Sequence, residues 1–154
     1  MYKVRLFATK NSRLFEATYF TLYPLSVFVL KYFSKFTANR LDGFVTFIER
    51  NLKGFFFDCK MCGNCVLSTT GMSCPMNCPK NIRNGPCGGV RENGNCEVKL
   101  EMRCVWVEAW NGSKKMKHGH QINDFHFIVD NRLKGSSSWL RIMREGIDKD
   151  EPAV

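Results

Sequence analysis

Eight cysteines lie within one stretch of the 154-residue chain, and thiols at this density either bind metal or form disulfides. The first three follow the spacing C-x2-C-x2-C, the next two form C-x3-C, and three single cysteines complete the set. The sequence does not show which of them share a site. The eight residues are Cys59, Cys62, Cys65, Cys74, Cys78, Cys87, Cys96 and Cys104.

The opening triplet, Cys59, Cys62 and Cys65, is the most informative part of the pattern. Thiolates at this spacing can hold three corners of a cubane, and in bacterial ferredoxins a more distant cysteine followed by proline completes the set. Both Cys74 and Cys78 are followed by proline. The spacing therefore favours a 4Fe-4S cluster at a first site.

Zinc and disulfides are the alternatives to iron. A zinc ribbon normally presents two separate C-x2-C knuckles, so zinc is the weaker interpretation of the triplet. It stays open for a second site, because four cysteines would remain and tetrahedral thiolate ligation needs no special spacing. Disulfides are weaker still, since a reducing cytoplasm keeps thiols free. All three histidines lie after the cysteine segment, which indicates ligation by thiolates alone.

A glycine-rich turn from Arg83 to Gly89 surrounds Cys87. Glycines let backbone amides approach and donate to sulfur, which tunes the potential of a cluster, and an arginine can balance the negative charge of a four-thiolate site. A plain tight turn explains the same residues equally well. The candidate cofactor-binding residues are Arg83, Gly85, Gly88 and Gly89.

The segment that carries the cysteines lacks the residues of an ordinary core. No aromatic residue lies between Phe57 and Trp106, and large apolar residues are few there. Such a segment cannot offset its loss of conformational entropy by burial alone, so we expect metal to cross-link it.

Before the cysteines, two apolar stripes with helical periodicity, at 25–36 and 41–52, predict a helical hairpin. Pro24 suits the first turn of the first helix, Asn39 the cap of the second, and Gly54 its end. An aromatic stripe of this kind is more typical of core packing or a partner interface than of a membrane surface.

After the glycine-rich turn, Asn93-Gly94 predicts a tight β-hairpin, and alternating residues from Cys96 to Cys104 predict a strand. Residues 105–110 predict a short helix. The expected fold class is α+β: a small cysteine-rich, metal-stabilised domain with an N-terminal helical hairpin and a short β-hairpin. The expected divisions are an N-terminal segment with the helical hairpin (1–54), an eight-cysteine metal-binding domain (55–110) and an irregular C-terminal tail (111–154).

The net charge of +9 is spread over the chain. Scattered basic residues suit an acidic partner, such as a ferredoxin that donates electrons, whereas nucleic acid is disfavoured because no aromatic residue in the cysteine segment can stack on bases. The longest apolar run, 19–30, is too short for a transmembrane segment, and no signal peptide is evident, so we expect a cytoplasmic protein. Nucleotide-binding and acid–base motifs are absent, which argues against a free-standing enzyme.

The cysteine motifs resemble the methylenetetrahydrofolate reductase C-terminal domain family, which includes the small cysteine-rich subunit of two-subunit bacterial reductases. This resemblance implies that all eight cysteines are candidate metal ligands. It also implies a partner, a flavin-binding barrel subunit that reduces methylenetetrahydrofolate. The motifs are Cys59-Lys60-Met61-Cys62-Gly63-Asn64-Cys65, Cys74-Pro75-Met76-Asn77-Cys78-Pro79-Lys80, Arg83-Asn84-Gly85-Pro86-Cys87-Gly88-Gly89, Cys96-Glu97-Val98 and Cys104-Val105-Trp106.

The hypothesis that follows is an accessory subunit of an oxidoreductase that carries one or two 4Fe-4S clusters and relays electrons to the flavin of its partner. Zinc at one of the two four-cysteine sites remains compatible with it. The alternative is a zinc-stapled structural or nucleic-acid- or protein-binding module without redox activity.

Overall fold

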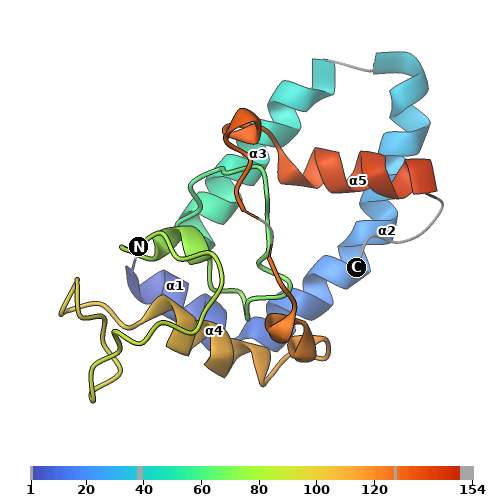
Figure 1. Ribbon diagram of the computed structural model, residues 1–154. Helices are drawn as coiled ribbons and strands as arrows, with labels where there is room; N and C mark the ends of the chain where they lie inside the picture. Colours follow the sequence, from blue (N-terminus) through green and yellow to red (C-terminus); the bar gives the residue numbers. More distant parts are fainter. Residues whose placement is uncertain (1, 38–39, 127, 150–154) are drawn as a thin grey trace.

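The computed structural model describes residues 2–37, 40–126 and 128–149, and helices joined by irregular loops make up nearly all of it (Figure 1). The α-helices are α1 (Tyr2–Lys10), α2 (Ser12–Thr37), α3 (Arg40–Phe57), α4 (Val105–Ser113) and α5 (Ser138–Lys149). Three short 3-10 helices are η1 (Pro75–Asn77), η2 (Gly119–Asn123) and η3 (Asn131–Leu133).

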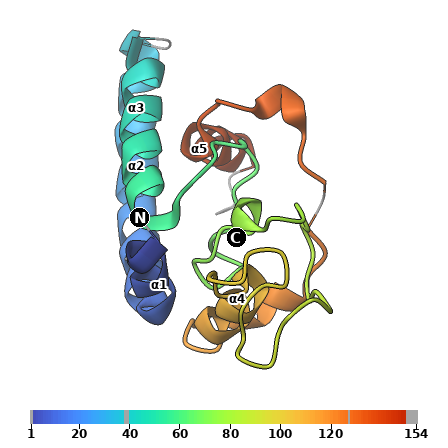
Figure 2. The ribbon, with the colours of Figure 1, turned by 90° about the vertical axis from the view of Figure 1, so that its left-hand side faces the viewer.

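The predicted helical hairpin exists as α2 and α3, but the two helices lie apart in Figure 1, and α5 contacts both of them. Viewed from the side, α1, α2 and α3 form one layer, and the cysteine segment lies beside it with α4 and α5 (Figure 2). The loops that carry the cysteines therefore lie beside the layer formed by α1, α2 and α3.

The predicted helix ends were wrong at Pro24 and Gly54, while Asn39 lies outside the described residues. The helix α2 begins twelve residues before Pro24, because Ser12 and Glu16, one turn apart, are buried polar anchors that a search for apolar periodicity does not detect. Ser12 Oγ donates to Gly112 O at 2.7 Å. The helix α3 passes through Gly54 and ends at Phe57.

The first half of the cysteine segment has a core after all. Leu67, Met72 and Cys74 are buried in a cluster with Phe57 and Ala8. Aromatic side chains from α2 and α3 complete it, as edge-on contacts join Phe15 to Phe56 at 5.3 Å and to Phe57 at 5.4 Å between ring centroids. The expectation that no ordinary core forms at this segment is corrected here, because residues distant in sequence supply the missing rings.

The α+β fold class is wrong, since the described residues contain no sheet and no β-hairpin. The turn at Asn93-Gly94 forms, with Arg91 N donating to Asn95 O at 2.9 Å, but only isolated bridges join Val90 to Cys96 and Asn95 to Arg103. The apolar residues whose alternation predicted a strand are not covered by another part of the structure, since Val98 and Leu100 are more than half exposed. A two-stranded ribbon without a covered face is only marginally stable.

The predicted short helix after the cysteines is confirmed as α4. The tail is not irregular throughout, because it contains η2, η3 and the helix α5. Leu140 and Met143, one turn apart on α5, are 5% and 7% exposed, and this apolar side packs the helix onto α2 and α3.

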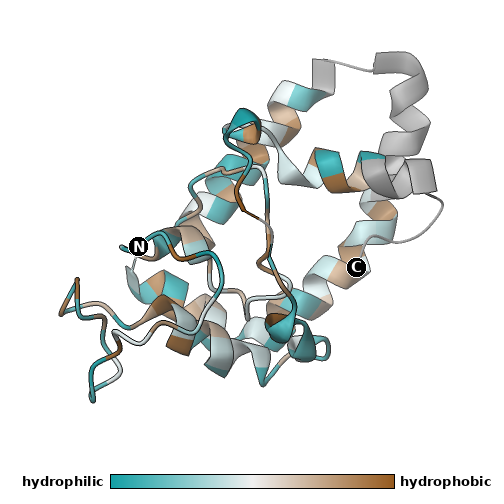
Figure 3. Cartoon of the chain, viewed as in Figure 1, coloured by the Kyte–Doolittle hydropathy of each residue, from teal (hydrophilic) through white to brown (hydrophobic). Residues whose placement is uncertain are grey.

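Much of the aromatic surface of α2 and α3 stays uncovered in this chain. Phe28, Phe44 and Phe47 are all more than 60% exposed, and apolar residues can be followed along both helices where they are described (Figure 3). Within the described residues, none of the helices has the length and apolar character needed to cross a bilayer.

Candidate metal centre

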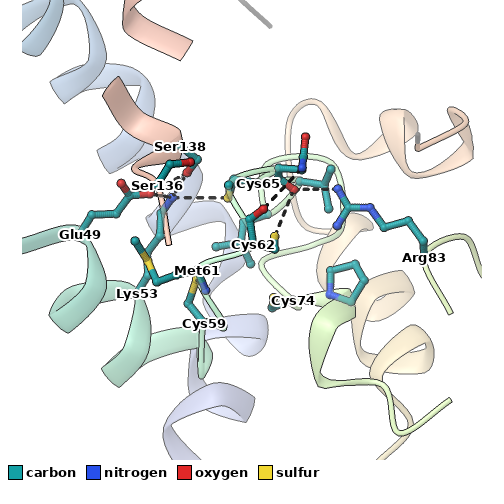
Figure 4. Close-up of a pocket in the computed structure, with 15 residues that line it drawn as sticks. Glu49, Lys53, Cys59, Met61, Cys62, Cys65, Cys74, Arg83, Ser136 and Ser138 are labelled. Atoms are coloured by element: carbon teal, nitrogen blue, oxygen red, sulfur yellow. Dashed lines mark hydrogen bonds and ion pairs between the residues drawn. The ribbon is translucent and has the colours of Figure 1, made fainter. Parts of the chain in front are cut away.

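Four of the eight cysteines line one recess beside the C-terminal end of α3 (Figure 4). They are the triplet Cys59, Cys62 and Cys65 together with Cys74. The structure thus brings together the four residues that the triplet and the first Cys-Pro pair indicated.

Local backbone geometry turns the triplet toward the recess. Met61 and Gly63 have φ values of 47° and 75°, so the chain folds back between successive cysteines. Gly63 is required there, because a Cβ would collide with the backbone oxygen of Leu133. Met61 N also donates to Cys59 Sγ at 3.3 Å, which is the kind of amide–sulfur bond that stabilises a thiolate.

The fourth thiol approaches from the loop that follows. Pro75 opens η1, and its fixed φ suits this first helical position, so that Cys74 is placed directly before the turn. Cys74 is 7% exposed. The backbone at this turn is tied to α3, because Asn77 Nδ2 donates to Phe57 O at 2.9 Å.

The four thiols influence one another electrostatically. Burial, and after it the charges of the nearby Cys59, Cys65 and Cys62, raise the pKa of Cys74 to about 12. Burial likewise raises the pKa of Cys59. Because only the thiolate binds metal, filling this site would release protons and gather negative charge in a small volume.

Positive groups surround the recess. Lys53 Nζ lies 3.4 Å from Cys65 Sγ. On the other side, Arg83 Nη2 donates to Asn64 O at 2.7 Å and Arg141 Nη1 donates to Asn64 Oδ1 at 3.0 Å. These cations match the charge of a four-thiolate centre. Arg83, one of the candidate cofactor-binding residues, lines the recess.

Sequence reasoning missed a buried polar cluster behind the recess. Glu49, Lys53, Ser137 and Ser138 are all less than 7% exposed. Lys53 Nζ lies 2.6 Å from Glu49 Oε1, and Ser138 Oγ donates to the same oxygen at 2.6 Å. The spacing of Glu49 and Lys53, four residues apart on a helix, was a readable signal for an ion pair. Nothing in the sequence indicated that this pair is buried.

Charge is retained in this cluster despite its burial. Burial by itself would raise the pKa of Glu49, but Lys53 and the hydroxyls of Ser137 and Ser138 lower it below its ordinary value. Burial would lower the pKa of Lys53, whereas Cys65 and Glu49 raise it. Both groups are therefore ionised at neutral pH.

The other four cysteines, Cys78, Cys87, Cys96 and Cys104, lie outside this recess. Cys96 N donates to Met102 O at 2.8 Å and Cys104 N donates to Gly94 O at 3.1 Å, so that backbone hydrogen bonds connect the loop segments that carry these two cysteines. Both are buried, at 7% and 6% exposure, and Cys78 is buried as well.

The predicted glycines belong to this second region and not to the recess. Gly89 N donates to Cys87 Sγ at 3.4 Å, as expected for an amide that faces sulfur. Gly85 packs against the ring of Trp106, where a side chain has no room, and Gly88 is exposed. Across 2–37, 40–126 and 128–149, no three Cys, His, Asp or Glu side chains converge on a point that one metal ion would occupy.

The donor set of the recess fits an iron–sulfur cluster. Four cysteines line it, a backbone amide donates to Cys59 Sγ, and the Lys53 ammonium lies 3.4 Å from Cys65 Sγ. In a cubane each thiolate binds a different iron, so the four sulfurs need not converge on one point.

These features define a class: a helical domain with a thiol-lined recess and a second group of cysteines in loops. The chain matches the family described as methylene-tetrahydrofolate reductase C terminal over residues 38–132, and it belongs to that family. The match begins just before α3 and ends within η3, so that α1, α2 and α5 lie outside it. No curated protein and no solved structure matches the chain.

Proposed function

We propose that this chain is an iron–sulfur subunit that docks on a flavin-dependent methylenetetrahydrofolate reductase and passes electrons to its flavin. The observation that carries the proposal is the gathering of Cys59, Cys62, Cys65 and Cys74 around one recess. Family membership supports an association with the reductase, and the ferredoxin-like spacing supports iron over zinc.

The residues around the recess have distinct tasks in this proposal. The four cysteines would hold a 4Fe-4S cluster, which takes up and releases one electron at a time. Met61 N stabilises the Cys59 thiolate through its 3.3 Å hydrogen bond. Leu67 and Trp139 lie close to the site, and their apolar side chains limit the access of water.

A second metal site is proposed at Cys78, Cys87, Cys96 and Cys104, which are the cysteines left when the recess is filled. These residues would hold another 4Fe-4S cluster or a zinc ion. The metal would also replace the sheet that this region lacks, because Val98 and Leu100 leave little apolar burial to order it.

Docking on the flavoprotein barrel subunit is proposed through the uncovered aromatic surface of α2 and α3. Phe28, Phe44 and Phe47 are exposed there, and exposed apolar patches of this kind mark interaction sites. The basic surface, with a net charge of +9, suits an acidic electron donor such as a ferredoxin. The thiols require a reducing compartment, which the cytoplasm provides.

The deciding experiment is anaerobic purification of the chain, followed by analysis of iron, acid-labile sulfide and zinc and by reduction with dithionite. The proposal requires iron and sulfide together with a visible absorption that bleaches on reduction. A colourless chain that contains only zinc would refute electron transfer and establish the zinc-stapled module.

Matched cysteine variants test the division into two sites. Cys74→Ser should remove the cluster of the recess, about four iron atoms per chain, and leave the second metal in place. Cys104→Ser should do the reverse. If both variants lose the same metal, the division of the cysteines is wrong.

A further inference from the structure

The buried ion pair of Glu49 and Lys53 lies directly beside the thiol-lined recess (Figure 4). The side chains are 1% and 6% exposed, so both charges are almost fully withdrawn from water. Desolvation of two charges offsets most of their attraction, and a well-packed apolar pair would join α3 to α5 at least as well. Stability therefore does not account for the two charges.

The lysine ammonium has three N–H donors, and each has an acceptor in this structure. Lys53 Nζ lies 2.6 Å from Glu49 Oε1, 2.8 Å from Ser138 Oγ and 3.4 Å from Cys65 Sγ. The ring of Trp139 covers the ammonium, with its centroid 5.0 Å from Nζ. One donor of a fixed, water-shielded cation is thus directed at a cysteine of the triplet.

Residues at the start of α5 hold the carboxylate that fixes this cation. Ser137 Oγ donates to Glu49 Oε2, and Trp139 N approaches the same oxygen at 3.4 Å. Ser138 Oγ contacts both Glu49 and Lys53. The ammonium consequently has one position, which is set by the packing of α5 on α3.

We propose that Lys53 is a positioning residue that raises the reduction potential of the cluster in the recess, and that Glu49 partly offsets it. This inference rests on the proposed function. When the cluster accepts an electron, its negative charge increases, and a cation that donates to a ligand sulfur stabilises the reduced form more than the oxidised form. The low dielectric around the buried Lys53 ammonium strengthens this effect.

The test is a potentiometric titration of the anaerobically reconstituted full chain, followed by the EPR signal of the reduced cluster. The relevant signal is identified as the one that Cys74→Ser abolishes. Lys53→Met should disfavour reduction by roughly tenfold, equivalent to a fall of about 59 mV in midpoint potential for one electron. Glu49→Gln should shift the potential in the opposite direction, because it removes the compensating negative charge.

Two further variants serve as controls. Arg144→Met also removes one positive charge and a contact between α5 and α3, since Arg144 pairs with Asp42 at 2.7 Å, but this pair is at the surface and should leave the potential unchanged. Lys53→Arg keeps the charge and should retain most of the wild-type potential. Glu49→Gln alters little volume and gives the sign of the effect even if Lys53→Met loses its iron.

The outcomes separate the two proposals. Opposite shifts in Lys53→Met and Glu49→Gln support the tuning role. Equal potentials in wild type and both variants overturn it and reduce the ion pair to a structural contact, while the iron–sulfur function stands. A wild-type chain that holds zinc and no cluster overturns the proposed function and this inference together.

Discussion

Replacement of Glu16 by glutamine tests how α2 is attached to the backbone at Lys117 and His118. The carboxylate is 4% exposed and accepts hydrogen bonds at both oxygens. Lys117 N donates to Oε2 at 2.7 Å, and His118 N donates to Oε1 at 2.9 Å, with His118 Nδ1 3.0 Å from the same oxygen. Glutamine offers one oxygen only, so its amide group must face a buried N–H donor. A hydrogen bond to a charged group contributes about 1.5–3 kcal/mol, and we expect Glu16→Gln to cost about 2–3 kcal/mol.

The assay is urea unfolding of anaerobically purified protein with equal metal content, followed by the helical circular dichroism signal. Burial by itself would raise the pKa of Glu16, but hydrogen bonds from His118 and Lys117 lower it below its ordinary 4.5. Its contribution is therefore complete above the unfolded pKa and is lost only as the pH falls through the lower folded pKa. The stabilisation by Glu16 should therefore be present at neutral pH and be lost only in acid.

A control on the same helix is Arg13→Gln, which changes an exposed residue and should alter the free energy of unfolding by less than about 0.5 kcal/mol. The reasoning would be refuted by a Glu16→Gln variant as stable as this control. A difference that is absent at neutral pH and appears only in acid would also contradict it, because the Glu16 carboxylate loses its charge as the pH falls.

Three other predictions address the site and its support. Gly63→Ala should destabilise by more than about 1–2 kcal/mol and release iron during gel filtration, because a positive φ and the backbone of Leu133 both exclude a Cβ. Trp106→Phe should lower the free energy of unfolding by about 1–2 kcal/mol, since the indole N–H donates to Ile82 O at 3.2 Å; an unchanged urea midpoint would contradict this. Burial, together with a nearby arginine, lowers the pKa of His126 below 6.5, so the fold should lose stability as the pH falls through 6.5, and His126→Gln should lack that part of the pH dependence in urea titrations.

Some predictions failed because a local pattern was read without its surroundings. The alternation from Cys96 to Cys104 is a valid strand pattern, yet no neighbouring surface covers Val98 and Leu100, and no sheet forms in the described residues. The start of α2 was missed because two of its buried residues, Ser12 and Glu16, are polar. Apolar periodicity detects burial only where the buried residues are apolar.

The sequence by itself determined the chemistry available to this protein. Eight thiols, the C-x2-C-x2-C triplet and the two Cys-Pro pairs define soft metal ligands, and the motifs around them are sufficient to place the chain in its family. Helical periodicity also predicted that a pair of helices precedes the cysteines, because side-chain spacing reports directly on a regular backbone.

Only the tertiary structure decided which residues meet. In the fold, Cys74 lines the recess with the triplet, whereas Cys78 does not. The fold also places Lys53 Nζ 3.4 Å from Cys65 Sγ. It also supplied Ser138, which lies 85 positions from Lys53 in the chain and is in contact with it in the fold. Such contacts depend on how separate helices pack, and the spacing of residues within any one segment carries no record of that packing.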